Sequence, residues 1–235
     1  EPLVKSGGNH LPETWSQALT SAAAKIKEIP AAQTAIIASG RMTNEELFLA
    51  RALAAEIGTS QISLVPRFAE ADALLIAADR NPNTTGAKLI LGTKDPFANL
   101  NSIREGIRNG SIKSLIVLGD DLITDAGFTA EDLGKLDFLL QTSMLANPTA
   151  EQAHIVLPSA AFAEKRGSMV NLSGRLQRLN QQGACASWFK SHGQSRDAKF
   201  EAVTIQDGHL LENLDLFRFE TGFASADVQA IILVQ

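Results

Sequence analysis

Two short loops with glycine stand where phosphate chemistry could occur. Ser39-Gly40 follows a buried apolar run at residues 34–38, and Gly119-Asp120-Asp121 follows another at 114–118. Glycine lets the backbone approach a phosphate, and the start of the next helix favours an anion. Neither loop is a GxGxxG or Walker motif, and the two aspartates would repel a phosphate unless they accept from ribose or guanine donors. A plain strand-to-helix turn is the simpler interpretation.

A third polar segment spans residues 164–177. It contains Glu164, Gly167-Ser168, Asn171, Gly174-Arg175 and Gln177. Such a glycine-rich segment could line a pocket, but its spacing alone fits a solvated loop with two turns at least as well.

The remaining reactive side chains have structural explanations. His154 lies within an apolar strand, where a satisfied ring is expected rather than a catalytic base. Glu45 and Glu46 stand in the first turn of a predicted helix and favour its dipole. Cys185 is the one cysteine, whereas an iron–sulfur cluster usually needs four. The four histidines show no metal-ligand spacing, so no metal site and no catalytic residue are expected.

The composition is that of an ordinary globular chain. Of 235 residues, 45% are hydrophobic and 20% charged, and the net charge of −5 disfavours nucleic acid and anionic membranes as partners. No apolar run approaches the roughly 18 residues that a membrane span needs, so no direct membrane insertion is expected. The first residues do not resemble a signal peptide and suggest a chain cut from something longer. A reducing cytosol fits the single cysteine.

The first third of the chain predicts a βαβ unit. Apolar spacing indicates a helix from Trp15 to about residue 29, with Thr14 as its cap. A strand at 34–38 is followed by a helix that opens with a Thr43/Glu46 capping box and stops at Gly58. A further strand at 61–65 completes the unit, which favours a parallel sheet.

Later elements continue the alternation. Strands are predicted at 114–118, 138–141 and 153–157, and helices near 98–108 and 129–135. Residues 72–78 could form a strand or one helical turn, and residues 89–91 a short strand. Residues 1–12 are predicted to form a loop. From 181 onward we expect a loop, a helix at 207–216 and a strand at 228–234. The fold class is therefore α/β, with a Rossmann-like parallel sheet and helices on both faces. These patterns alone indicate no reaction.

Three segments in order resemble the molybdopterin-oxidoreductase family. They are residues 2–19, with Pro2-Leu3-Val4-Lys5 and Trp15, residues 110–119, and residues 149–177 with the run Ala153-His154-Ile155-Val156-Leu157-Pro158. Residues 79–87 and 162–167 look most like the large iron–sulfur subunit, the G subunit, of NADH–quinone oxidoreductase. The resemblance covers residues 1–180, as a truncated domain, and not 181–235, a C-terminal extension of unknown role.

The resemblance implies a fold like the middle domains of formate dehydrogenase and DMSO reductase. Catalytic relatives hold molybdenum or tungsten between two pterin dinucleotides, and iron–sulfur clusters in an N-terminal segment that this sequence lacks. Several matching positions are altered here, among them Asp120-Asp121, Ser143 and His154. The positions that would form a vestigial pterin site are Ser39, Gly40, Gly119, Asp120, Asp121, Ser143, Glu164, Asn171, Arg175 and Gln177.

Two hypotheses about function follow from the resemblance. The first is a non-catalytic module of NADH–quinone oxidoreductase, without cofactor or independent activity, which packs against other peripheral-arm subunits on the cytoplasmic face of the inner membrane. The alternative is an oxidoreductase fragment that still binds a molybdopterin guanine dinucleotide. A stand-alone nucleotide-binding protein has only the fold in its favour. The enzyme hypothesis needs the three loops around one deep cleft with cations such as Arg41, Lys165, Arg166 or Arg175. The module hypothesis predicts loops that are apart or filled in.

Overall fold

The computed structural model describes residues 1–180, and the helix and strand expected beyond residue 181 lie outside that range. A seven-stranded sheet forms its centre, in the order β2-β1-β7-β6-β5-β3-β4. The five strands from β3 to β7 are parallel, and β1 and β2 extend the sheet antiparallel beyond β7. The strands are β1 Leu3–Ser6, β2 Asn9–Pro12, β3 Thr34–Ala38, β4 Ile62–Leu64, β5 Ser114–Leu118, β6 Phe138–Ser143 and β7 Ile155–Pro158.

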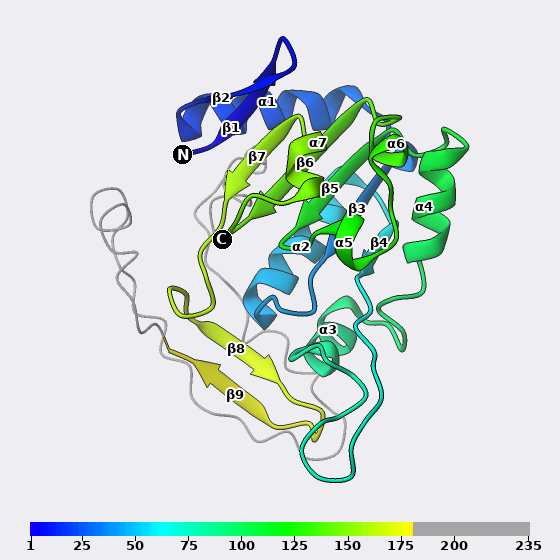
Figure 1. Ribbon diagram of the computed structural model, residues 1–235, viewed down its shortest axis with the longest axis vertical. Coiled ribbons are helices and arrows are strands. Elements are labelled where there is room, and N and C mark those ends of the chain that lie inside the picture. The colour runs from blue at the N-terminus through cyan, green and yellow to red at the C-terminus, as the bar shows by residue number, and fades with distance from the viewer. Residues whose placement is uncertain (181–235) are drawn as a thin grey trace.

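Helices cover both faces of this sheet (Figure 1). They are α1 Trp15–Glu28, α2 Asn44–Ile57, α3 Thr84–Leu91, α4 Leu100–Arg108, α5 Leu122–Asp125, α6 Ala130–Leu133 and α7 Pro148–Gln152, with a short 3-10 turn at Ala31–Gln33. Alternate strand residues enter separate cores: Ile36 and Ile116 pack with α1 and α2, whereas Ile37 and Val117 pack with α4 and α6. Burial on both faces explains why the strands read as continuous apolar runs. The predicted α/β class is confirmed.

The helix signals act as the sequence predicts. Thr43 and Glu46 form the reciprocal capping box of α2, with Glu46 N to Thr43 Oγ1 at 3.2 Å and Thr43 N to Glu46 Oε2 at 2.6 Å. Gly58 ends that helix at φ 81°, a conformation that glycine adopts without a side-chain clash. Thr14 caps α1 through the backbone N–H of Gln17.

Three local predictions are wrong. Residues 1–12 form the β1–β2 hairpin rather than a loop, because β1 pairs with β7, far along the chain. Leu91 and its two predecessors end helix α3 instead of forming a strand. Residues 72–78 form neither a strand nor a helix but the tip of an exposed loop. Each failure concerns a short apolar or polar stretch whose local pattern is ambiguous.

A second, two-stranded sheet lies below the first in Figure 1. Its strands β8 Gly167–Val170 and β9 Leu176–Leu179 pair antiparallel. The polar segment at 164–177 is therefore largely a β-hairpin. Among residues 1–180, no helix is long and apolar enough to cross a bilayer.

The His154 ring is satisfied within the structure, which confirms its predicted role. Its Nδ1 accepts the backbone N–H of Leu139 at 2.9 Å, and the backbone N–H of His154 donates to the Leu139 carbonyl at 2.8 Å. Burial lowers the pKa of the half-buried imidazole, and nearby Lys5 lowers it further. Only the neutral ring can accept the Leu139 proton.

Protonation of His154 should therefore destabilise the fold. Because the folded pKa lies below the unfolded value, stability is complete above about pH 6.5 and falls as the pH drops through the folded pKa. The variant His154→Asn keeps an acceptor near the same place but does not titrate. Thermal unfolding measured between about pH 7.5 and about pH 5.5 should show a smaller loss of Tm in His154→Asn than in wild type. Equal losses would contradict this assignment.

Candidate functional site

The two glycine loops meet where ligands bind in open α/β sheets. From β3 the chain adds β4 on one side and then β5, β6 and β7 on the other side, although all five strands are parallel. The gap between β3 and β5 is therefore the topological switch point. Ser39-Gly40 follows β3 and Gly119-Asp120-Asp121 follows β5. The Ser39 hydroxyl donates to Asp120 Oδ1 at 2.9 Å across the gap. The structure therefore brings together two of the three candidate loops directly.

Arg67, just beyond the end of β4, holds the Asp120 carboxylate. Its guanidinium donates to Asp120 Oδ1 at 2.7 Å and Oδ2 at 3.3 Å, and to Asp125 Oδ2 at 2.6 Å. The Asp120 side chain is fully buried. Burial raises the pKa of the Asp120 carboxyl, although Arg67 and Ser39 partly offset this rise. The ion pair thus sits in the crevice itself.

Asp121 is committed to the starts of helices α5 and α7. Its carboxylate accepts from the backbone of Ile123 at 3.2 Å and from the hydroxyls of Thr124 at 2.5 Å and Thr149 at 2.6 Å. Partial burial raises the pKa of Asp121, but these hydrogen bonds outweigh that effect and the net pKa is lowered. Neither aspartate has been left free for a guanine or ribose donor.

The backbone approach that Gly40 permits is also used internally. A Cβ added at Gly40 would lie 2.6 Å from Cγ of Asn81, which is itself buried. The Gly40 carbonyl accepts the backbone N–H of Asn83 at 3.1 Å. The space beside this glycine is therefore filled by the chain's own asparagine.

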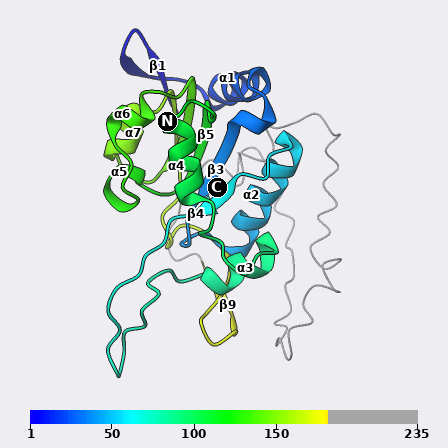
Figure 2. The same ribbon diagram turned by 90° about the vertical axis from the view of Figure 1, so that its right-hand side faces the viewer.

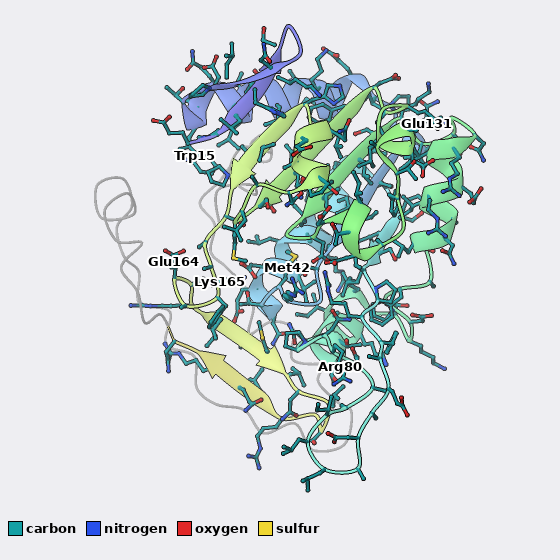
Figure 3. All side chains as sticks on the ribbon, in the orientation of Figure 1. Trp15, Met42, Arg80, Glu131, Glu164 and Lys165 are labelled. Carbon is teal, nitrogen blue, oxygen red and sulfur yellow. The ribbon has the colours of Figure 1, made fainter. Side chains whose placement is uncertain are left out.

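The third segment rests on the start of α2. Glu45 accepts from the backbone N–H and hydroxyl of Ser168, each at 2.8 Å, and Lys165 pairs with Glu46 at 2.8 Å. Figure 3 labels Lys165 and Glu164 on the segment that leads into β8. Glu45 and Glu46 thus have a role beyond the predicted helix dipole, because they hold the hairpin.

Asn83 joins this hairpin to the loops above it. Its side-chain amide donates to the Met42 carbonyl at 2.8 Å and to Asn44 Oδ1 at 3.0 Å, and its Oδ1 accepts the N–H of Val170 at 2.8 Å. The polar run at residues 79–83 predicts a turn, and this is the local sequence signal that Asn81 and Asn83 offer. It does not indicate that these asparagines, or Arg67, take part in a site.

The other candidate residues lie apart from the switch point or serve local turns. Ser143 donates to the Leu145 carbonyl at 2.7 Å, and Glu164 accepts the N–H of Ala161 at 2.9 Å. Asn171 closes the hairpin turn by accepting from the backbone of Ser173 and Arg175. The side chains of Arg175 and Gln177 extend from the same hairpin, and Gln177 is exposed. Whether any of the ten candidates contacts a pterin remains a prediction.

In this arrangement the polar groups that a pterin dinucleotide would need are largely occupied. Its phosphates require free cations, but Arg67 is engaged by two aspartates and Lys165 by Glu46, which leaves Arg41 as the exposed cation at the switch-point loops. Its guanine requires a free acceptor, yet Asp120 and Asp121 are both occupied. A surface hollow lined by Ala31, Ala32 and residues 58–61 lies at the opposite edge, where β3 and β4 begin. Among residues 1–180, no group of three His, Cys, Asp or Glu side chains could hold a metal ion.

Loss of Arg67 should be costly because it would leave Asp120 buried and unpaired. We expect Arg67→Met to lower the free energy of unfolding by about 3–5 kcal/mol at neutral pH. Asp125→Asn removes only the more exposed partner of the same arginine and should cost about 1 kcal/mol or less. Urea unfolding of both variants checks this. Equal small losses would mean that the buried pair is not important.

Loss of Asn83 should release the hairpin before it unfolds the sheet. We expect Asn83→Ala to cost about 2–3 kcal/mol, since buried partners lose their hydrogen bonds, and to speed proteolysis within residues 160–180. Asn101→Ala is the control, because Asn101 is exposed and its side chain accepts from Arg104 on the same helix. Cleavage sites mapped by mass spectrometry should separate the two. An unchanged cleavage rate in Asn83→Ala would contradict the role of this clamp.

Comparison with known proteins agrees with this architecture. The model of the family described as molybdopterin oxidoreductase matches residues 80–197, half of the chain. The G subunit of NADH-quinone oxidoreductase from Shewanella oneidensis is 31% identical over 134 residues, which are 56% of this chain and 14% of that protein. The alpha subunit of NADPH-Fe(3+) oxidoreductase from Geobacter sulfurreducens is 36% identical over 94 residues, 37% of this chain and 11% of that protein.

The matched part is thus a small fraction of these curated relatives. Because the family model matches half of the chain and the mostly parallel sheet is consistent with it, the chain belongs to the molybdopterin oxidoreductase family.

Proposed function

We propose that this chain is a non-catalytic structural module of NADH–quinone oxidoreductase, within a component that resembles the G subunit of that complex. The observation that carries this proposal is the filled switch point, where Arg67 and Ser39 both donate to the Asp120 carboxylate. The similarity to the Shewanella oneidensis protein supports the choice of complex. In this proposal residues 1–180 form the family domain, and electrons pass through clusters held elsewhere.

Exposed apolar side chains near the carboxyl ends of β6 and β7 support a packing role. Met144 and Leu145 follow β6, and Phe162 follows β7; these side chains are 53%, 76% and 70% exposed. The backbone N–H of Ser159 donates to the Ser143 carbonyl at 3.0 Å, which ties the two loops together. Exposed apolar clusters of this kind are typical of surfaces that contact other proteins. We propose that these loops face neighbouring peripheral-arm subunits, on the cytoplasmic side of the inner membrane.

The second candidate function is binding of a molybdopterin guanine dinucleotide by an oxidoreductase fragment. The strand order favours it, because two glycine loops flank the switch point. Arg41, at the end of the first loop, is exposed and has no ion-pair partner among residues 1–180. Binding would require Arg67 or Asn81 to leave its present partners, and this cost favours the structural role.

Cofactor analysis separates the two proposals. The protein is purified from a host that makes the molybdenum cofactor, alongside a catalytic family member as positive control, and both are analysed for molybdenum and for pterin by mass spectrometry. We expect the control to be loaded and this protein to contain neither at stoichiometric level. Stoichiometric pterin or molybdenum would overturn the structural proposal.

The packing role has a separate test in the native host. We expect the change of Met144, Leu145 and Phe162 to aspartate to reduce co-purification with peripheral-arm subunits at least about tenfold, because the contact would lose its apolar burial. Leu11→Asp, at an exposed position on β2, is the matched control and should not change the yield of partners. Equal recovery with both variants would contradict this surface assignment.

A further inference from the structure

The loop between β4 and α3 exposes three consecutive large aliphatic side chains. Leu74, Leu75 and Ile76 are 86%, 84% and 44% exposed at the tip of residues 68–79, which we call the apolar knob. Isolated exposed leucines are common on protein surfaces, but three in succession at a projecting tip form a contiguous apolar patch.

The apolar knob has a defined internal structure. Asp72 Oδ1 accepts the backbone N–H groups of Leu74, Leu75 and Ile76 at 2.9, 2.6 and 2.8 Å. Two backbone bonds close the loop beneath, from Asp72 N to the Ile76 carbonyl and from Ala69 N to the Ala78 carbonyl, both at 3.0 Å. The tip is therefore already organised, which reduces the entropy that docking must cost.

The charges within the apolar knob are all negative. Glu70, Asp72 and Asp79 lie within it, and no lysine or arginine does. At its base Arg67 is paired with Asp120, whereas Arg80 keeps its positive charge and donates to the Glu70 backbone carbonyl at 2.6 Å, so the knob with Arg80 still carries a net negative charge. The complementary surface would be apolar with a basic rim.

One segment of the same chain carries both exposed apolar side chains and arginines that are unpaired within residues 1–180. Residues 162–178, which we call the basic hairpin, expose Phe162 and Leu172 at 70% and 54%. Its three arginines have no ion-pair partner among residues 1–180; they are Arg166, Arg175 and Arg178. Lys165 is instead paired with Glu46.

The two surfaces project from the same end of the molecule. Figures 1 and 2 place the β4–α3 loop and the β8–β9 hairpin at the lower end in views that differ by 90°. Two complementary patches on one end of a chain can meet twice around a two-fold axis, as in isologous dimers. We propose that a second copy of this chain docks here, with each apolar knob on the partner's basic hairpin. This inference goes beyond the proposed function and shares one residue, Phe162, with the surface proposed there; its tests below use Leu75, Glu70 and Arg178, which lie outside that surface.

Other occupants fit less well. Contact between the two knobs would bring carboxylates together, and an anionic membrane would repel the same acidic rim. The reciprocal arrangement pairs opposite charges in both contacts and buries the aliphatic tips at the same time.

Sedimentation equilibrium of the purified chain over a range of concentrations tests the proposal. We expect a reversible dimer, and Leu75→Asp should weaken its Kd at least about tenfold. Leu11→Asp is the control, because Leu11 is an exposed leucine on β2, far from both surfaces in Figure 1. Tm should be unchanged in both variants, since neither side chain is buried.

Charge reversal tests the pairing itself. The side chain of Glu70 accepts no hydrogen bond within residues 1–180, so Glu70→Lys should weaken the dimer without disturbing the loop, as should Arg178→Glu. The double variant Glu70→Lys/Arg178→Glu should recover part of the lost affinity. A monomer at every concentration would overturn the proposal, as would a dimer that none of these changes affects. Leu75-dependent sedimentation with phosphatidylserine vesicles would assign the knob to membranes instead and would equally overturn it.

Discussion

The ion pair between Arg67 and Asp120 is the constraint on which the carboxyl-end edge of the parallel strands depends. A buried carboxylate must have a partner, because the cost of leaving it unpaired would be a large part of a domain's stability. Asp120 follows β5, Ser39 follows β3, Arg67 follows β4, and Asp125 lies at the end of α5. The Arg67–Asp120 pair, with Ser39 bound to the same carboxylate and Asp125 to the same guanidinium, thus links three strand ends and one helix.

The need to pair Asp120 also fixes the path of the loop between β4 and α3. At the start of this loop Arg67 points into the crevice, and at its end Asn81 packs against Gly40. Two residues later Asn83 reaches Met42 and the β8 strand, so the polar contacts continue from the switch point to the hairpin. Both ends of the loop are therefore held, while its tip at residues 72–78 is left to solvent. The exposed tip is a consequence of firmly fixed ends.

Sequence alone predicts the parts of this fold that rest on local chemistry. Strands β3 and β5 are fully buried, and Thr43, Glu46 and Gly58 delimit α2 by capping alone. The β1–β2 hairpin depends on pairing with β7 about 150 residues away, for which no local pattern exists. Strand order predicts that two loops converge, yet Arg67 lies 53 residues from Asp120 and nothing in its neighbourhood marks it. Long-range polar pairs are the part that sequence patterns do not contain.

Electrostatics support the proposal that this crevice holds its internal ion pair rather than a dinucleotide. A pyrophosphate entering the switch point would compete with Asp120 for Arg67 and would leave two anions close together in a buried place. Asp120 could avoid this repulsion only by taking up a proton, and burial already raises the pKa of its carboxyl toward that state. An entering dinucleotide would therefore have to bring a proton or a cation with it. The pair between Arg67 and Asp120 needs neither a proton nor a cation from outside. This difference favours the arrangement in which the two side chains bind each other and no ligand enters the crevice.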